Sequence, residues 1–315
     1  MLEKMYIRKE SFMENIIIIG AGPAGISAAL YAKRSNMDPL VIHNGIGALD
    51  KAEKIENYYG LEEPLSGKEL YERGIAQARA LGIRIMEAQM LGVRGFDPFE
   101  VVTTEGSFET RSIIFATGSK RMRPPIPGIK EMEGKGVSYC AVCDAFFYRG
   151  KDVAVLGNGD YALHEAEELA NVAGNVTIFT DGKEPAFSRD HSIPLNTLKI
   201  QSIEGDELVT GIRLEEPAAS EKAGTSEKSP EVPVSGVFVA VGTAGSADMA
   251  RQMGAALSEK GNIKVDEDMA TNIPGVYAAG DCTGGLLQVA KAVHEGALAG
   301  LSAVSFVRKN KKEDR

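Results

Sequence analysis

Two cysteines separated by two residues are the side chains of this sequence best suited to redox chemistry. Cys140 and Cys143 enclose Ala-Val, and Asp144 follows directly. Cysteines at this spacing can close a small disulfide ring, and a neighbouring thiol or a helix terminus lowers the pKa of one of the two thiols. A carboxyl group next in sequence can carry the proton that thiol–disulfide exchange moves. The spacing therefore predicts a redox-active dithiol with Asp144 as its acid–base partner.

A zinc site and a pair of inert buried thiols are the alternatives for these two cysteines. Zinc in a structural site takes four ligands, and the remaining cysteine, Cys282, adds at most one. Zinc-ligand spacing is also missing among the four histidines, which are His43, His164, His191 and His294. We therefore expect no metal site and favour a redox pair over inert thiols. Cys282 is expected to be a small buried residue without a redox role.

A glycine-rich segment near the N-terminus indicates dinucleotide binding. The pattern Gly20-x-Gly22-x-x-Gly25 follows the apolar, β-branched run Ile16–Ile19 and precedes a helical stretch. In this context the first glycine permits a tight turn, the second lets the backbone approach a pyrophosphate, and the third lets helix and strand pack closely. The helix N-terminus adds partial positive charge. At the end of the next strand, Asn44 stands where an acid usually binds the ribose, and its amide can replace that hydrogen bond.

A second turn of the same type occurs in the middle of the chain. The pattern Gly157-x-Gly159-x-x-Ala162 follows the apolar run Val153–Leu156 and precedes another helical stretch. Two such units in one chain indicate duplication and two nucleotide sites, at least ancestrally. Asp181, after the next strand, would repel a 2′-phosphate but stands near the position where an acid binds the ribose hydroxyls of NADH. The second turn is therefore either an NADH site or a vestige of a nucleotide site.

Length and charge limit the class of protein. At about 100–200 residues per domain, 315 residues predict two domains. The chain has 44 Asp and Glu against 35 Lys and Arg, a net charge of −9 that argues against non-specific nucleic-acid binding. No apolar run approaches the roughly 18 residues of a membrane span, and the N-terminus lacks the apolar core of a secretory signal. We therefore expect a cytoplasmic protein without nucleic-acid or membrane partners.

Local patterns also predict the elements that position these motifs. The prolines at 124–127 form a stiff linker, which is typical of a domain boundary. The segment from 215 to 235 is rich in Glu, Ser, Ala, Pro and Lys and is expected to be a solvated hairpin loop. Between 179 and a strand near Leu208 there is no room for a helix and a further strand. The other predicted elements are helices over 66–81 and 287–306 and strands over 83–86, 113–115, 176–179 and 236–241.

Five motifs together resemble the low-molecular-weight thioredoxin reductases. They are Gly20–Gly25, Glu56–Gly60, Ala116–Gly118, Cys140–Asp144 and Gly280-Asp281, and they occur in the order and spacing of that family. The resemblance extends over residues 13–304. It implies an α/β fold of two Rossmann-like dinucleotide-binding domains, in which the CxxC-bearing domain is inserted into the FAD domain. The FAD domain would comprise residues 13–120 and 246–315, and the pyridine-nucleotide-type domain residues 121–245.

The resemblance also implies the cofactor, the roles of the cysteines and a homodimer. Cys143 would face the flavin of FAD and accept its electrons, Cys140 would attack the disulfide of a thioredoxin-like protein, and Asp144 would act as acid and base. Asp281 would contact the ribityl–phosphate region. The residues implied to hold FAD are Gly20, Gly22, Pro23, Ala24, Gly25, Asn44, Asn57, Ala116, Thr117, Gly118, Gly280, Asp281, Gln288, Val289 and Ala290. Those of the second nucleotide turn are Gly157, Gly159 and Ala162.

The electron donor is where the sequence departs from that family. The family normally carries a His-Arg-Arg cluster for the 2′-phosphate of NADPH, where this chain has Thr180–Lys183. The stretch Gly280–Gly284, Gly-Asp-Cys-Thr-Gly, resembles the ferredoxin-dependent flavin thioredoxin reductases. We therefore favour ferredoxin over NADH or NADPH as donor, with the cations of 120–123 offsetting the acidic net charge. A flavoprotein redox sensor without rapid turnover is the alternative from another class.

Four aromatic residues flank the CxxC pair, and either a core or a partner could use them. Core packing is the expected use of Tyr139, Phe146, Phe147 and Tyr148. Shielding of the flavin or contact with a protein partner is the alternative.

Overall fold

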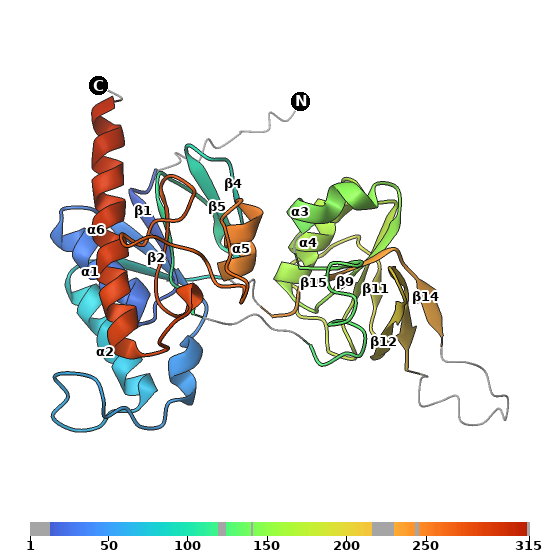
Figure 1. Cartoon of the computed structure of the whole chain (residues 1–315), viewed down its shortest axis with the longest axis horizontal. Helices are drawn as coiled ribbons and strands as arrows, with labels where there is room; N and C mark the ends of the chain where they lie inside the picture. The colour runs from blue at the N-terminus through green and yellow to red at the C-terminus, as the bar shows by residue number, and fades with distance from the viewer. Residues whose placement is uncertain (1–12, 119–123, 140, 216–229, 243–245, 314–315) are drawn as a thin grey trace, which may run out of the picture. The chain divides into compact units, whose positions relative to one another are not determined.

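The chain folds into two compact units, which Figure 1 shows in the computed structural model. The structure describes residues 13–118, 124–139, 141–215, 230–242 and 246–313. The first unit consists of Met1–Lys120 and Met253–Arg315, and the second unit is the intervening Arg121–Gln252. Helix α5 (Ser246–Gln252) belongs to the second unit, whereas the sequence-based boundary after residue 245 falls before this helix.

A five-stranded parallel sheet in the order β16-β7-β1-β2-β3 forms the centre of the first unit. Its strands are β1 (Ile16–Ile19), β2 (Pro39–His43), β3 (Arg84–Glu87), β7 (Ile113–Phe115) and β16 (Val276–Ala278). All four residues of β1 are buried, as the continuous apolar run predicts for a strand covered on both faces. Because parallel strands present their carboxyl ends at one edge, the turns after β1, β7 and β16 meet at that edge.

Helices α1 (Pro23–Arg34) and α6 (Val289–Glu313) lie side by side in the first unit (Figure 1). Their backbones approach closely because α6 has glycine at the crossing. A Cβ on Gly296 would lie 2.1 Å from the carbonyl oxygen of Ala24, and one on Gly300 would lie 2.5 Å from that of Ala28. This contact holds the beginning of α6 beside the first glycine turn.

The rest of the first unit follows local sequence signals. Helix α2 (Gly67–Ala80), expected over 66–81, begins with a capping box, in which Ser66 and Glu69 each bind the other's backbone N–H. A small antiparallel sheet in the order β4-β5-β6 lies between β3 and β7 in sequence. Its strands are β4 (Met90–Arg94), β5 (Phe99–Thr103) and β6 (Gly106–Thr110).

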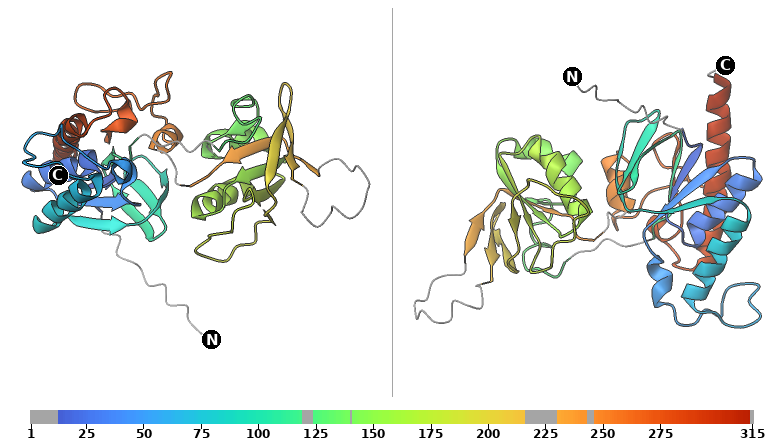
Figure 2. Two further views of the ribbon diagram at one scale, coloured as in Figure 1. Left: turned by 90° about the horizontal axis from the view of Figure 1, so that it is seen from below. Right: turned by 180° about the vertical axis from the view of Figure 1, so that it is seen from behind.

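The second unit combines a parallel and an antiparallel sheet (Figure 2). Apolar residues of both sheets form one buried core. The parallel sheet has the order β11-β10-β9-β15-β8, with β8 (Val137–Ser138), β9 (Asp152–Leu156), β10 (Asn175–Phe179), β11 (Leu195–Asn196) and β15 (Gly236–Val239). The antiparallel sheet consists of β12 (Ile200–Gly205), β13 (Val209–Leu214) and β14 (Glu231–Pro233). The helices are α3 (Ala141–Asp144), α4 (Asp160–Ala170) and α5, and a 3-10 turn, η2 (Ala145–Tyr148), follows α3. The prediction of an α/β fold with two Rossmann-like units is confirmed.

The strand expected near Leu208 is β13, which begins at Val209. Two details differ from the sequence-based expectation. The two-residue strand β11 pairs in parallel with β10, so a further strand does exist, although the segment between β10 and β12 holds no helix, as predicted. The predicted loop over 215–235 contains β14, which pairs with β13 as one side of a hairpin. The remainder of that loop, residues 216–229, lies outside the described residues.

Within the part of the chain that the structure describes, no helix is both long and apolar enough to cross a membrane.

Candidate active site

The first glycine turn joins β1 to α1, and two of its glycines are required by packing. A Cβ on Gly20, which has φ +113°, would lie 2.3 Å from the carbonyl oxygen of Ala116, and one on Gly25 would lie 1.8 Å from that of Gly20. Gly22 is different, because a Cβ there would meet nothing within 4 Å. Gly22 is also the N-cap of α1, and its end of the helix has no side-chain cap. Open space at an uncapped helix N-terminus fits a pyrophosphate group.

A second turn, after β16, lies against the first. Gly280 has φ +84°, and a Cβ there would lie 3.0 Å from the Cβ of Ala24 in the first turn of α1. Asp281 follows directly and is half-buried. Burial raises the pKa of Asp281, the nearby Lys291 ammonium opposes this shift, and Glu295 adds to it. The structure thus brings a carboxyl group next to the first glycine turn, and a carboxylate can accept hydrogen bonds from hydroxyl groups of a ligand.

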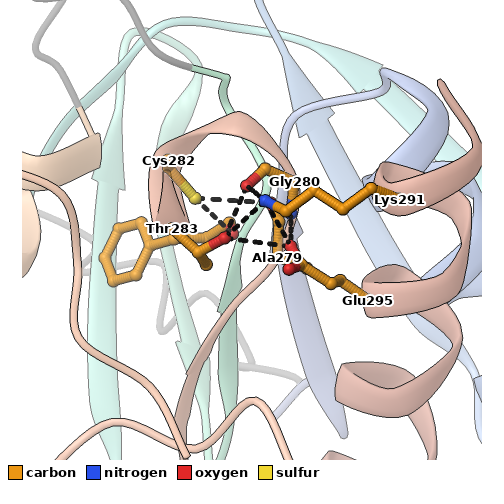
Figure 3. A network of polar contacts seen from close by, with 7 residues as sticks. Ala279, Gly280, Cys282, Thr283, Lys291 and Glu295 are labelled. Carbon is orange, nitrogen blue, oxygen red and sulfur yellow. Dashed lines mark hydrogen bonds and ion pairs between the residues drawn. The ribbon is translucent and has the colours of Figure 1, made fainter. Parts of the chain in front are cut away.

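A network of partly buried polar groups fixes this second turn to α6 (Figure 3). The Lys291 ammonium donates to the carbonyl oxygen of Gly280 at 2.9 Å and to the Thr283 hydroxyl at 2.8 Å. The Glu295 carboxylate accepts the N–H of Gly280 at 2.8 Å and pairs with Lys291 at 3.0 Å. Sequence reasoning missed Lys291 and Glu295. The available signal was an opposite-charge pair four residues apart in a helix segment of mostly small and apolar residues.

The other residues predicted to hold FAD lie near these turns or at the edge of the sheet. Asn57 donates to the side-chain oxygen of Gln288 at 2.9 Å, one residue before α6 begins at Val289. Asn44 is exposed after β2, where His43 is hydrogen-bonded to Tyr71 at 3.1 Å. Pro23 and Ala24 open α1, Ala290 lies in the first turn of α6, and Ala116, Thr117 and Gly118 follow β7.

Cys282 is buried, as predicted, at 3% exposure. Its thiol donates to the carbonyl oxygens of Ala279 at 3.3 Å and Phe115 at 3.4 Å. The described residues contain no cluster of three or more His, Cys, Asp or Glu side chains that could hold a metal ion.

The dithiol segment is described only in part. Cys140 lies outside the described residues, and Cys143 is a residue of α3 whose side chain is not described. Asp144 ends α3 and accepts a hydrogen bond from the Ser138 hydroxyl at 2.6 Å. The N–H of Ala141, the first residue of α3, donates to the carboxyl group of Glu165 at 2.8 Å. This contact joins the CxxC helix to the middle of α4.

Glu165 was not found by sequence reasoning. Its side chain is 2% exposed, and burial raises its pKa to about 7, against the stabilising hydrogen bonds from Ala141 and Gln252. An acid at a position of α4 that should face the core was the signal in the sequence, but a motif search does not detect it.

The aromatic residues beside the CxxC pair divide into two groups. Tyr139 is buried, and Tyr148 packs edge-to-face on Phe238. Phe146 and Phe147, in contrast, are 71% and 66% exposed, so the expectation of core packing is wrong for these two. They lie in η2, whose short turn directs consecutive side chains outward, and their rings contact each other edge-to-face.

The second glycine turn is covered by its own chain. The N–H of Ala186 donates to the carbonyl oxygen of Asn158 at 2.7 Å, and the Asn158 side chain donates to the carbonyl oxygen of Glu184 at 2.8 Å. The N–H of Ser188 donates to the Asp160 carboxylate, at the first residue of α4, at 2.8 Å. We call residues 184–188 the covering segment. It is hydrogen-bonded to Asn158, just before the N-cap of α4, and to the Asp160 side chain, and its Ala186 carbonyl oxygen would lie 3.6 Å from a Cβ on Gly159.

Two charged residues after β10 also have partners within the second unit. The Asp181 carboxylate accepts the N–H of Ile200 at 3.0 Å. Arg189 forms an ion pair with Glu167 at 2.5 Å. Both side chains therefore have partners in the same unit. The cations at 120, 121 and 123, expected to meet a ferredoxin, lie outside the described residues.

Comparison with known proteins identifies the family. Residues 14–296 match the family model described as pyridine nucleotide-disulphide oxidoreductase. The thioredoxin reductase of Aquifex aeolicus is 37% identical over 314 residues, covering 95% of this chain and 94% of that protein. The crystal structure of the atypical thioredoxin reductase TRi from Desulfovibrio vulgaris Hildenborough has 39% identity and a TM-score of 0.83, over 94% of this chain and 99% of that one.

A crystal structure of a ferredoxin-flavin thioredoxin reductase from Clostridium acetobutylicum is also similar, with 31% identity and a TM-score of 0.67 over 94% of this chain and 98% of that one. Its similarity is lower than that of the atypical enzyme. The open, uncapped turn at Gly22 and the adjoining Gly280-Asp281 turn fit FAD, the cofactor of this group of enzymes. The chain belongs to the pyridine nucleotide-disulphide oxidoreductases and, within them, to the low-molecular-weight thioredoxin reductases, with FAD as its cofactor.

Proposed function

We propose that this chain is a cytoplasmic, homodimeric thioredoxin reductase that takes electrons from reduced ferredoxin. In this proposal the electrons pass by way of FAD to the Cys140–Cys143 disulfide and then to the disulfide of a thioredoxin-like protein. The observation that carries the choice of donor is the covering segment over the second glycine turn.

The first unit holds FAD in this proposal. The turn at Gly20, Gly22 and Gly25 binds the pyrophosphate, and Asp281 binds hydroxyl groups of the ribityl–phosphate region. Asn57, Gln288 and the residues that begin α6 would hold the flavin end of the cofactor. When bound, FAD supplies the electron pair that reduces the Cys140–Cys143 disulfide.

The second unit performs the exchange with the partner. The Cys140 thiolate attacks a disulfide of the thioredoxin-like protein, which forms a mixed disulfide and releases one partner thiolate. Cys143 then attacks Cys140 of the mixed disulfide, which restores the Cys140–Cys143 bond and releases the second partner thiolate. Asp144, held by Ser138 at 2.6 Å, supplies and accepts the protons.

Three observations argue against a pyridine nucleotide as donor. The covering segment takes the space that a pyrophosphate would need beside the middle glycine, since a Cβ on Gly159 would lie 3.6 Å from the carbonyl oxygen of Ala186. Asp181, the candidate for binding the ribose of NADH, is bound to the N–H of Ile200. Arg189, a substitute for the cations that bind a 2′-phosphate, is neutralised by Glu167. A protein donor needs none of these groups.

The exposed aromatic pair supports docking of a protein partner. Phe146 and Phe147 present large apolar surface directly after the CxxC helix. Exposed aromatic residues of this kind are enriched where protein interfaces form. We assign this surface to the thioredoxin-like protein, which must reach Cys140.

An anaerobic donor titration tests the choice of ferredoxin. The holoenzyme is mixed with reduced ferredoxin, NADH or NADPH, and loss of the oxidised flavin absorption is followed. Ferredoxin is expected to bleach the flavin at a rate that supports turnover, whereas neither nucleotide does so. Bleaching by NADH or NADPH at a turnover rate would overturn this choice. Reduction by ferredoxin without any reduction of a thioredoxin-like disulfide would favour a redox sensor.

A matched pair of cysteine variants tests the two sulfur roles. Cys143→Ser, mixed with an oxidised thioredoxin-like protein, is expected to trap a mixed disulfide through Cys140. Cys140→Ser is expected to trap none and to lose partner reduction, while flavin reduction by the donor persists. Trapping by Cys140→Ser instead would reverse the assignment.

A further inference from the structure

The buried acid Glu165 is a group of the second unit that the proposed exchange does not use. Its Oε2 accepts the N–H of Ala141 at 2.8 Å, and its Oε1 lies 3.5 Å from the side-chain nitrogen of Gln252 in α5. Ala141 is covalently joined to Cys140 and begins the helix that carries Cys143. Glu165 is therefore hydrogen-bonded to the residue that follows Cys140 in the chain.

The surroundings of Glu165 supply two hydrogen bonds to its carboxylate but no paired cation in the described part of the chain. Among the described residues, no lysine or arginine pairs with it. The acidic groups near it are Glu168 of its own helix and Asp248 of α5, and both raise its pKa. Asp144 ends the helix that Glu165 contacts. Desolvation is the largest cause of a pKa of about 7, so that a small change in local charge alters the protonation of Glu165 near neutral pH.

A change in local charge is what the redox reaction produces. The disulfide carries no charge. A reduced pair with one thiol and one thiolate carries one negative charge. A thiolate close to an ionised carboxylate raises the affinity of the carboxylate for a proton, because two like charges in a buried site repel each other.

We propose that Glu165 is a positioning residue of the dithiol that fixes the start of the CxxC helix and takes up a proton when the disulfide is reduced. The proposal rests on the proposed function of Cys140 and Cys143. In the balanced step, the disulfide, ionised Glu165, two electrons and two protons give one thiol, one thiolate and protonated Glu165. The S–S bond breaks, and one S–H bond and one O–H bond form. The electrons come from FAD in the enzyme and from dithiothreitol in the test below. Oxidation by the partner disulfide releases the proton from Glu165.

Infrared spectroscopy of Glu165→Gln tests this proton uptake in the complete chain. Reduced-minus-oxidised difference spectra are recorded at pH 8 after reduction with dithiothreitol and removal of the reagent. The wild-type protein is expected to gain the carbonyl absorption of a protonated carboxyl group on reduction, and Glu165→Gln to lose this gain completely. Glu168→Gln, which removes a half-buried acid from the same helix, is the matched control and is expected to keep it. An equal gain in Glu165→Gln would overturn the proposal.

The pH dependence of disulfide reduction is a second readout. The measured quantity is the equilibrium constant for reduction of the wild-type disulfide divided by that of Glu165→Gln. If Glu165 takes up one proton on reduction, this ratio falls by up to about tenfold for each unit by which the pH rises above neutrality. A ratio that stays constant with pH would overturn the proposal, because a merely structural role changes the constant equally at every pH.

Two further results separate the possible failures. If Glu165→Gln does not accumulate as folded protein, Gln252→Leu is measured instead. This variant loses the hydrogen-bond donor to Glu165, so the pH at which the infrared carboxyl signal titrates is expected to rise. A wild-type chain in which no such titration is seen would overturn the proposal. Both measurements use dithiothreitol and need no physiological donor. A wild-type pair that cannot form a disulfide would contradict the proposed function itself, whereas reversible disulfide formation without a carboxyl signal would contradict the role of Glu165 alone.

Discussion

Replacing Glu165 by glutamine should stabilise the second unit above neutral pH and leave its stability almost unchanged in acid. Glutamine keeps the volume of the side chain and an oxygen that can accept the N–H of Ala141. The substitution therefore removes the ionisable proton with little change in packing.

The magnitude follows from the raised pKa. An acid whose pKa is higher in the folded than in the unfolded protein contributes fully to stability below its unfolded pKa, and this contribution is lost as the pH rises through the folded pKa. For Glu165 the pKa rises from 4.5 to about 7, which corresponds to about 3 kcal/mol of unfolding free energy lost above pH 8. The side chain is 2% exposed, so solvent screening does not reduce this figure. Glu165→Gln should regain it.

Hydrogen exchange measured by mass spectrometry is the suitable assay, because it reports on each unit separately. The slowest amides of β9 and α4 should exchange up to about 100-fold more slowly in Glu165→Gln than in the wild-type protein at pH 8. At pH 5 the two proteins should exchange at nearly equal rates. Glu168→Gln controls for the loss of charge from the helix. A difference that is equal at both pH values, or larger at pH 5, would refute the assignment of a buried, protonatable Glu165.

Three further predictions concern the turn, the polar network and the exposed aromatic surface. Gly22→Ala should fold normally, because its Cβ meets nothing within 4 Å, but it should bind FAD at least about tenfold more weakly in a flavin fluorescence titration. Gly20→Ala, in contrast, should lose on the order of 2 kcal/mol of unfolding free energy in urea. Lys291→Met should lower the unfolding free energy by about 3 kcal/mol, because Glu295 keeps a largely buried charge without its cation. Adding Glu295→Gln should recover part of this loss. An equal loss in the double variant would show that the unpaired Glu295 charge is not the cause. Phe146→Ala should raise the KM for the thioredoxin-like protein several-fold while flavin reduction by the donor is unchanged, and an unchanged KM would exclude this surface from docking.

The elements around both glycine turns could be predicted because their signals are local. A continuous apolar run, a glycine pattern and a following helix occupy adjacent positions, and the structure contains β1 with α1 and β9 with α4 as expected. The capping box that begins α2 is equally local. Core packing of the aromatic residues after the CxxC pair was predicted from residue type alone, and it is wrong for Phe146 and Phe147 because the direction of η2 decides their exposure.

Contacts between residues far apart in sequence could not be predicted. The hydrogen bond between Ala141 and Glu165 depends on how α3 packs against α4, and the parallel pairing of β11 depends on where the segment after β10 returns to the sheet. Neither contact leaves a periodic pattern in the sequence. An acid in an apolar helix face is a weak signal by itself, because most such acids are solvated.

The two glycine turns show why such a pattern predicts a fold more securely than a ligand. In the second turn, a Cβ on Gly157 would lie 2.2 Å from the carbonyl oxygen of Ala240, so packing alone requires this glycine whether or not a nucleotide binds. The middle glycine is the position that distinguishes the turns. A Cβ on Gly22 would meet nothing within 4 Å, whereas one on Gly159 would lie 3.6 Å from the carbonyl oxygen of Ala186, in the covering segment. Space at the middle glycine is thus the physical requirement for a pyrophosphate, and it depends on a segment that the pattern does not include.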